Sequence, residues 1–284
     1  MKRFYREAAA VQGEDGWHVA LDGRRVKTQG GHALVLPNEA VARLLAAEWD
    51  AQGEEIDPRG FPMRDLADYA LDVVAKDKAA ALAALLRYAE TDTLCYRADP
   101  DEPLWKRQQE LWEPLLCGCE ARDGIRLQRV SGVMHRAQDE TALAALRARL
   151  EAMDYLTLAA LTTLASLAAS LVIGLAALEP GADGEALWNA ANLEEDWQAE
   201  QWGWDHEAEV TRARTAEALA RTHKLNILGI LQKPLTMAAM EALLPADPER
   251  ARTPGAVLME VRGWSVGHPE RPGQDAIRDA AFTV

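Results

Sequence analysis

Acidic and aromatic side chains are concentrated between residues 192 and 210, in the segment NLEEDWQAEQWGWDHEAEV. No Lys or Arg offsets its charge. Its carboxylates are Glu194, Glu195, Asp196, Glu200, Asp205, Glu207 and Glu209, and its tryptophans are Trp197, Trp202 and Trp204. These tryptophans cannot all face one core, because successive helical residues differ in direction by about 100°. Aromatic contact area rimmed by carboxylates favours a protein-binding surface that selects a basic partner.

Two other interpretations of this segment stay open. The carboxylates can form a solvated helix face whose tryptophans enter the core. Alternatively, Asp205, His206 and Glu207 can form an acid–base cluster in the carboxylate-lined pocket of a small-molecule enzyme. The enzyme interpretation is the weaker, because adjacent residues on a helix point in different directions.

Motifs for catalysis or metal binding are scarce elsewhere in the chain. The pair Cys117 and Cys119 lacks neighbouring ligands at the spacing of a zinc site, and it is not the C-x-x-C of thioredoxin-like proteins. The sequence also contains no G-x-S-x-G, no phosphate-binding G-x-x-x-x-G-K and no H-E-x-x-H. The scarcity of such motifs disfavours an enzyme with catalytic residues and disfavours a metal site at the cysteine pair.

The first part of the chain has the pattern of a small antiparallel sheet. Trp17, Val19 and Leu21 alternate with less apolar residues, which predicts a half-buried strand. The following Asp22-Gly23 favours a tight hairpin, because this turn needs positive φ. We expect the second strand over residues 24–28 and a third over residues 32–36.

From residue 37 onward the apolar spacing is helical, which predicts an α+β fold: a small N-terminal antiparallel β domain followed by a larger all-helical domain. Asn38 is expected to cap the first helix, and Asp183 a long last helix that ends near Ala220. The predicted divisions are a β-rich domain over residues 1–60, a helical domain over 61–222 and a proline-containing extension of unknown role over 223–284.

An uncharged run between Tyr155 and Leu178 is long enough for a membrane span, which needs roughly 20 apolar residues. It is rich in Ala, Thr and Ser, and acidic residues flank it where basic anchors would be expected. We predict a buried core helix and no stable membrane insertion. A membrane-attached protein that uses this run as its anchor remains the alternative.

The net charge of −14 disfavours binding to nucleic acid, which needs clustered Lys and Arg. Three cysteines give no disulfide framework, so a reducing compartment is expected. The first residues include no apolar targeting segment, and the bacterial cytoplasm is the expected location.

Several short motifs, taken in order, resemble the ATP synthase assembly chaperones of the ATP-twelve family. The matching residues are Arg3-Phe4-Tyr5, Gly16-Trp17, Leu21-Asp22-Gly23-Arg24, Val26-Lys27-Thr28, Leu36-Pro37, Glu48-Trp49-Asp50-Ala51-Gln52-Gly53, Ile56-Asp57-Pro58, Pro62-Met63, Thr91-Asp92, Leu94-Cys95-Tyr96-Arg97-Ala98, Gln108, Trp112, Pro114-Leu115-Leu116, Trp197-Gln198, Glu200, Trp202-Gly203 and Asp205. The similarity extends from about Lys2 to Arg212. The family's Gly-Ser pair in the apolar run is Ala169-Ser170 here, which leaves open whether the run forms one helix or two.

The resemblance implies a chaperone that binds the free α subunit of F-type ATP synthase and holds it for assembly with β, without cofactor or chemistry. For such a protein we expect the partner-binding residues to be Glu195, Gln198, Trp202, Asp205 and Glu207. Trp49, Asp50 and Gln52 are expected to hold the domain junction.

Overall fold

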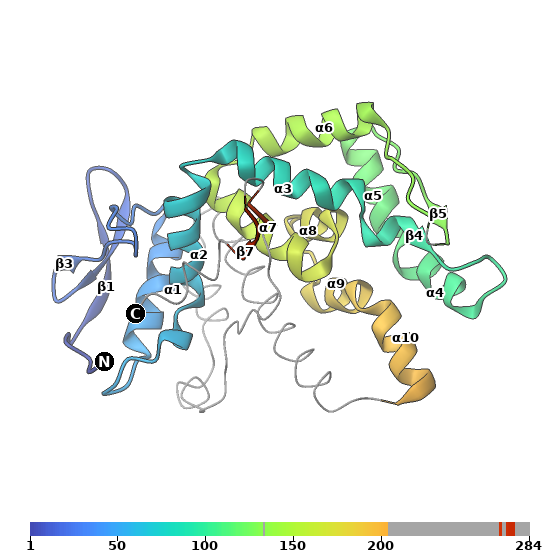
Figure 1. Cartoon of the computed structure of the whole chain (residues 1–284). Helices are drawn as coiled ribbons and strands as arrows, with labels where there is room; N and C mark the ends of the chain where they lie inside the picture. Colours follow the sequence, from blue (N-terminus) through green and yellow to red (C-terminus); the bar gives the residue numbers. More distant parts are fainter. Residues whose placement is uncertain (133, 204–266, 269–270, 276–284) are drawn as a thin grey trace.

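The computed structural model of the chain describes residues 1–132, 134–203, 267–268 and 271–275. A small antiparallel sheet lies at one end, and helices make up most of the remaining described chain (Figure 1). This arrangement confirms the predicted α+β class. The predicted boundary near residue 60 falls between helices α1 and α2, and the division into domains stays a prediction.

The sheet contains β1 (Ala8–Gln12), β2 (Trp17–Leu21) and β3 (Arg24–Arg25), in that spatial order and antiparallel. The predicted turn is confirmed, since Asp22 and Gly23 have φ of 47° and 79°. The prediction of a third strand over residues 32–36 is wrong. That segment forms only two isolated bridges, from Leu36 to Trp17 and from Ala33 to Lys27, because its two ends pair with different parts of the chain.

The chain then forms α1 (Glu39–Asp50), whose N-terminus is capped as predicted by the Asn38 side chain, which accepts from Val41 N at 2.9 Å. The elements that follow are η1 (Pro58–Gly60), α2 (Pro62–Tyr69), the π-helical η2 (Ala70–Val74), α3 (Lys78–Glu90), η3 (Thr93–Cys95), β4 (Tyr96–Arg97), α4 (Pro103–Leu111), α5 (Glu113–Asp123), β5 (Val130–Ser131), α6 (Glu140–Glu151), α7 (Tyr155–Ala168), α8 (Leu171–Ala177), α9 (Gly184–Ala191), α10 (Leu193–Trp202), β6 (Gly267–His268) and β7 (Arg271–Asp275). Strands β4 and β5 pair in parallel, and β6 and β7 pair antiparallel.

The uncharged run forms two helices, α7 and α8, at the centre of the helical region. Ala169 ends α7 in the left-handed conformation, with φ of 47°, and Ser170 accepts a hydrogen bond from Ile173 N at 3.1 Å to begin α8. The two helices approach closely at Gly174, where a Cβ atom would lie only 2.9 Å from Leu161 Cδ1. A side chain at this position would therefore separate the helices.

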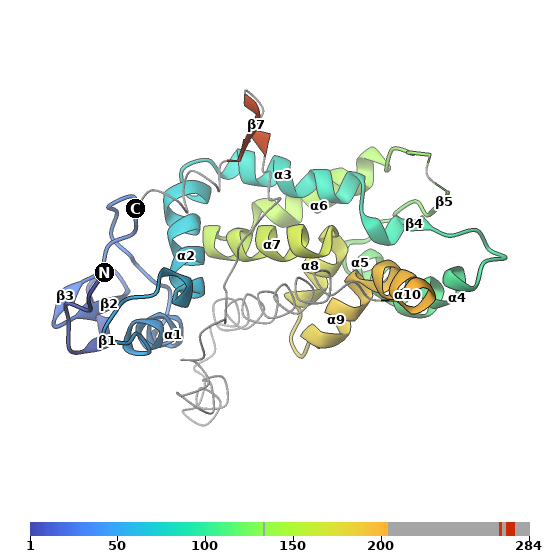
Figure 2. The ribbon, with the colours of Figure 1, turned by 60° about the horizontal axis from the view of Figure 1, so that its bottom comes forward.

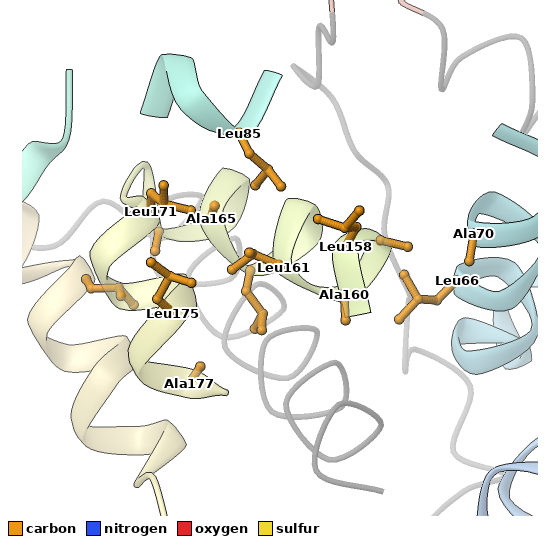
Figure 3. Close-up of a cluster of buried hydrophobic side chains, with 14 of the residues drawn as sticks. Leu66, Ala70, Leu85, Leu158, Ala160, Leu161, Ala165, Leu171, Leu175 and Ala177 are labelled. Carbon is orange, nitrogen blue, oxygen red and sulfur yellow. The ribbon is translucent and has the colours of Figure 1, made fainter. Parts of the chain in front are cut away.

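Nearly every side chain of α7 and α8 is buried, which confirms the predicted core placement. The helices supply apolar contacts to α2, η2 and α3 (Figure 3). Side chains drawn there include Leu66, Ala70, Leu85, Leu158, Leu161, Leu171 and Leu175. Within the described part of the chain, no helix has the length and apolar character needed to cross a membrane.

The prediction of one long last helix after Asp183 is wrong over the described residues. Asp183 caps α9 as expected, but the chain bends at Asn192 and continues as α10. The residues predicted to extend this helix toward Ala220 lie outside the described residues. Helices α9 and α10 lie near α4, at the end of the molecule distant from the sheet (Figures 1 and 2).

Candidate protein-binding surface

The inner side of α10 is fixed to the α4–α5 pair by buried polar side chains. Gln108 is fully buried; its Nε2 donates to Glu194 Oε1 at 2.8 Å, while its Oε1 accepts from Ala98 N at 2.8 Å. One turn further along, Trp112 Nε1 donates to the carbonyl of Ala190 at 2.7 Å. These bonds set the angle at which α10 leaves α9, because they hold residues on both sides of the bend.

A second contact fixes the middle of α10. The Arg107 guanidinium pairs with Glu200 at 2.8 Å, and its central carbon lies 4.6 Å from the ring centroid of Trp197. Trp197 is therefore half-buried against α4. Because it lies beneath Arg107, it is not part of the solvent-facing side of the helix.

The opposite side of α10 carries Glu195, Gln198 and Trp202, all exposed. At 100° per residue these positions fall within an arc of about 60°, so they form one narrow stripe. Trp202 is 81% exposed, which is unusual for so large an apolar side chain. We call these three residues the α10 outer face. The structure thus brings together three of the five residues predicted to bind a partner.

The other two predicted partner-binding residues, Asp205 and Glu207, lie outside the described residues, as does Trp204. The Asp205–His206–Glu207 cluster of the enzyme alternative lies there too. Among the residues that the structure describes, no group of three His, Cys, Asp or Glu side chains is placed to hold a metal ion. Cys95 and Cys119 are buried, and Cys117 is exposed.

The residues expected at the domain junction lie at the end of α1 and contact the N-terminal segment that precedes β1. Trp49 packs between Tyr5 and Phe61, with ring centroids 5.6 Å and 4.4 Å away, and its carbonyl accepts from the Tyr5 hydroxyl at 2.6 Å. Asp50 is exposed and pairs with Arg3 at 3.5 Å. A junction role for these residues stays a prediction.

Gln52, the third junction residue, is buried and ties the end of α1 to the loop that follows. Its Oε1 accepts from Asp57 N at 2.7 Å, and its carbonyl accepts from Arg3 at 2.7 Å.

Sequence reasoning missed the neighbouring Glu48. The Glu48 carboxylate accepts from Met63 N at 2.7 Å and Arg64 N at 2.9 Å, which caps α2 from another helix. No local pattern could identify such a cap, because donor and acceptor are far apart in the sequence.

Near the junction, Asp68 is a buried carboxylate on α2. It is 5% exposed, neither of its oxygens accepts a hydrogen bond from the described residues, and Arg64 Nε lies 3.8 Å away. Burial raises the pKa of Asp68 to about 7, partly opposed by Arg64. The folded protein therefore holds a proton here that the unfolded chain releases near pH 4.

We expect Asp68→Asn to flatten the pH dependence of stability. The pKa of Asp68 is higher in the folded protein than in the unfolded chain. Its protonation therefore stabilises the fold fully below the unfolded pKa, and this stabilisation is lost as the pH rises through about 7. The free energy of unfolding of the native chain should fall by about 2–4 kcal/mol from this group between acidic and mildly alkaline pH. Urea unfolding near pH 5 and near pH 8 measures this difference in the free energy of unfolding. The same difference in Asp68→Asn as in the native chain would contradict the raised pKa of Asp68.

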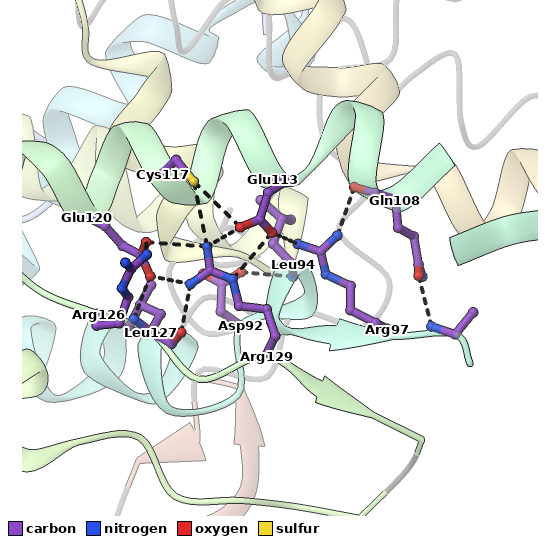
Figure 4. A network of polar contacts seen from close by, with 11 residues as sticks. Asp92, Leu94, Arg97, Gln108, Glu113, Cys117, Glu120, Arg126, Leu127 and Arg129 are labelled. Atoms are coloured by element: carbon purple, nitrogen blue, oxygen red, sulfur yellow. Dashed lines mark hydrogen bonds and ion pairs between the residues drawn. The ribbon is translucent and has the colours of Figure 1, made fainter. Parts of the chain in front are cut away.

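A polar network supports the helices that hold α10 (Figure 4). Arg97 is buried; it donates to the Gln108 carbonyl at 2.8 Å and pairs with Glu113 at 3.1 Å. Arg129, from the segment after α5, pairs with Glu113 at 2.7 Å and also with Glu120. Sequence reasoning missed this network, since its members lie on separate elements. It positions Gln108 and, through Gln108, the beginning of α10.

Comparisons with known proteins agree with this fold. Residues 2–120 match the family model described as ATP12 chaperone protein. The chain is 36% identical to the crystal structure of Atp12 from Paracoccus denitrificans, with a TM-score of 0.76, covering 80% of this chain and 98% of that one. Atu1473 from Agrobacterium tumefaciens is 39% identical, with a TM-score of 0.75, over 81% and 86% of the two chains. The mitochondrial protein atp12 of Schizosaccharomyces pombe is 26% identical over 215 residues, 71% of this chain and 74% of that one. The chain therefore belongs to the ATP12 family of ATP synthase assembly chaperones.

Proposed function

We propose that the chain binds the free α subunit of F-type ATP synthase through the α10 outer face and holds it until β arrives. The observation that carries this proposal is the 81% exposure of Trp202, on the same stripe as Glu195 and Gln198. The opposite side of the helix is held by Gln108 and Arg107, so the stripe is presented on a fixed support. A rigid support lowers the entropy that binding must overcome.

The chemistry of the stripe suits capture of an unpaired subunit. A subunit without its neighbour exposes apolar surface, and exposed apolar patches favour aggregation. Tryptophan provides a large contact area, while carboxylates around it accelerate encounter with a basic surface. Asp205 and Glu207 are included in the proposed surface as the continuation of the acidic segment. The proposal places this binding in the bacterial cytoplasm and involves no chemical turnover.

The partner is tested by capture with separately expressed α and β subunits and with the assembled catalytic head. We expect the chain to retain free α and to retain neither β nor the assembled head. Equal retention of β or of the head would contradict the choice of α as partner.

Variants of α10 test the surface. Trp202→Ala should weaken α capture by tenfold or more, because central aromatic contacts typically contribute at least 1–2 kcal/mol to binding. Glu195→Gln should slow capture, most clearly at low salt. Both variants should melt close to the native temperature, since substitutions of exposed residues usually change stability by less than about 0.5 kcal/mol. Capture kinetics and thermal melting measure the two effects separately.

Glu200→Gln is the matched control. It makes the same charge change as Glu195→Gln on the same helix, but on the side that faces Arg107. We expect it to leave the rate of α capture near the native value, because so exposed an ion pair contributes little and Gln108 and the Arg107–Trp197 contact still hold α10. Asp205→Asn and Glu207→Gln extend the series along the segment. Unaltered capture by the Trp202 and Glu195 variants would rule out the α10 outer face, and a lowered melting temperature with normal capture would make the segment structural.

A further inference from the structure

The loop of residues 28–32, which follows β3, is fastened to the helical region by the carboxylate of Asp72. This carboxylate accepts hydrogen bonds from Thr28 Oγ1 and from Gly30 N, both at 2.7 Å, and lies 2.6 Å from His32 Nδ1. Thr28 Oγ1 in turn accepts from His32 N at 3.0 Å, so the loop is also closed on itself. A Cβ atom at Gly30 would lie only 2.6 Å from Asp72 Oδ1, which leaves no room there for a side chain. We call Asp72 and this loop the clasp.

The clasp connects two parts of the fold that are far apart in the sequence. Asp72 lies on η2, a π-helical turn that is closed by a bond from Ala75 N to Ala70 O at 2.8 Å. Such turns are rare and frequently occur at functional sites. Helix α2, directly before η2, lies between the sheet and the rest of the helical region (Figure 1). The sheet also packs on α1, so the clasp is a second, polar attachment of the sheet to the helices.

The strength of the clasp depends on the charge of His32. Burial opposes ionisation of Asp72, but the hydrogen bonds from Thr28, Gly30 and His32 outweigh it and hold the pKa of Asp72 below its usual range. Histidine is the side chain that ordinarily changes its charge between pH 5 and 8. When protonated, His32 forms an ion pair with a carboxylate that is only 15% exposed; when neutral, it offers at most a hydrogen bond. The clasp is therefore tighter at the lower pH.

Three further groups near Asp72 carry or can carry charge, and all lie on α2. Arg64 and Asp65 pair with each other at 2.5 Å. Burial, and to a smaller extent the charge of Asp72, raises the pKa of Asp68 to about 7. Among the other helices packed against η2, α7 contains no charged residue, and Lys78 of α3 donates to two backbone carbonyls near the end of α6. Asp68 is therefore the group whose titration must be separated from that of His32.

We propose that His32 and Asp72 form a pH-dependent clasp between the sheet and the helical region, closed while His32 is protonated and loosened as the pH rises. Loosening frees the loop from η2, while the packing of the sheet on α1 remains. The pH thereby sets how firmly the sheet is held to the helices. The proposal is independent of the α10 outer face, which lies at the other end of the molecule (Figures 1 and 2).

Hydrogen exchange of the Gly30 amide measures the closed clasp, because this N–H donates to Asp72 Oδ2. The protection factor is the exchange rate of an unstructured peptide divided by that of Gly30 at the same pH. In the full chain it should fall by about fivefold between about pH 5.5 and about pH 8, the size expected for a half-exposed ion pair. A protection factor that does not fall over this range would overturn the proposal.

Two variants assign the titrating group. His32→Gln keeps a side-chain N–H that can donate to Asp72 but takes up no proton, so the protection of Gly30 should become nearly independent of pH. Asp68→Asn is the control, because it removes the neighbouring group that titrates near pH 7 and should keep the native fall. A fall that persists in His32→Gln and disappears in Asp68→Asn would assign the pH dependence to Asp68 and overturn the proposal.

A third variant tests the close approach of the loop to Asp72. Gly30→Ala places a Cβ against the carboxylate and should hold the clasp open. The amide of residue 30 should then exchange with the same low protection at both ends of the pH range, as in the loosened native chain. Protection that is as high and as pH-dependent in Gly30→Ala as in the native chain would show that the amide does not report a clasp, which would overturn the proposal.

Discussion

Leu161→Lys is expected to destabilise the protein by about 3–5 kcal/mol, a large part of the typical stability of a domain. Leu161 is completely buried on α7 and packs against α8 at Gly174, whose absent side chain leaves just enough room for it (Figure 3). The described neighbours in this layer are mainly apolar, so the ammonium group of a lysine would be buried in surroundings that disfavour a charge. Urea unfolding followed by circular dichroism measures the loss.

Two variants separate charge from shape. Leu161→Met keeps the volume and apolar character, and it should cost less than about 1.5 kcal/mol. Leu167→Lys places the same charge in the same helix at a partly buried position, where the long side chain can reach solvent. We expect the loss in the free energy of unfolding of Leu167→Lys to lie between the losses of Leu161→Met and Leu161→Lys. A stable Leu161→Lys protein with native melting would show that this position is not in the core.

Arg129→Ala is expected to destabilise the protein by about 3 kcal/mol, because it leaves carboxylates without their main partner. Burial opposes ionisation of Glu120, which is 5% exposed, yet hydrogen bonds from Arg129 and from Leu127 N hold its pKa below the usual range. Without Arg129, the partners of this carboxylate among the described residues are the exposed Arg126 and the Leu127 backbone. The free energy of unfolding at neutral pH measures the change.

Arg126→Ala is the matched control for this network. Arg126 also pairs with Glu120, at 3.0 Å, but its side chain is 83% exposed. Ion pairs at such exposed positions contribute roughly 0–1 kcal/mol, so the variant should remain close to native stability. Equal losses for Arg126→Ala and Arg129→Ala would show that burial does not distinguish the two pairs. We also expect Arg129→Ala to reduce α capture indirectly, through Gln108 and α10.

Local patterns in the sequence were sufficient for several elements. The turn at Asp22-Gly23 and the Asn38 and Asp183 caps depend on residues within a few positions of one another. The burial of the uncharged run also followed from composition and flanking charges. The α10 outer face could be anticipated in part, since helical geometry alone separates Trp197 from Trp202. In each case the sequence pattern that allowed the prediction lies within one turn or one continuous segment.

Other features depended on contacts between distant segments. Strand β1 was missed, because alanine has low strand propensity and only pairing with β2 makes Ala8–Gln12 extended. The bend at Asn192, the Glu48 cap on α2 and the support of α10 by Gln108 each join residues on different elements. The sequence by itself determined the fold class, the family and the acidic aromatic segment. The tertiary structure decided which of that segment's described side chains face solvent, because α4 covers one side of α10 and leaves Glu195, Gln198 and Trp202 exposed.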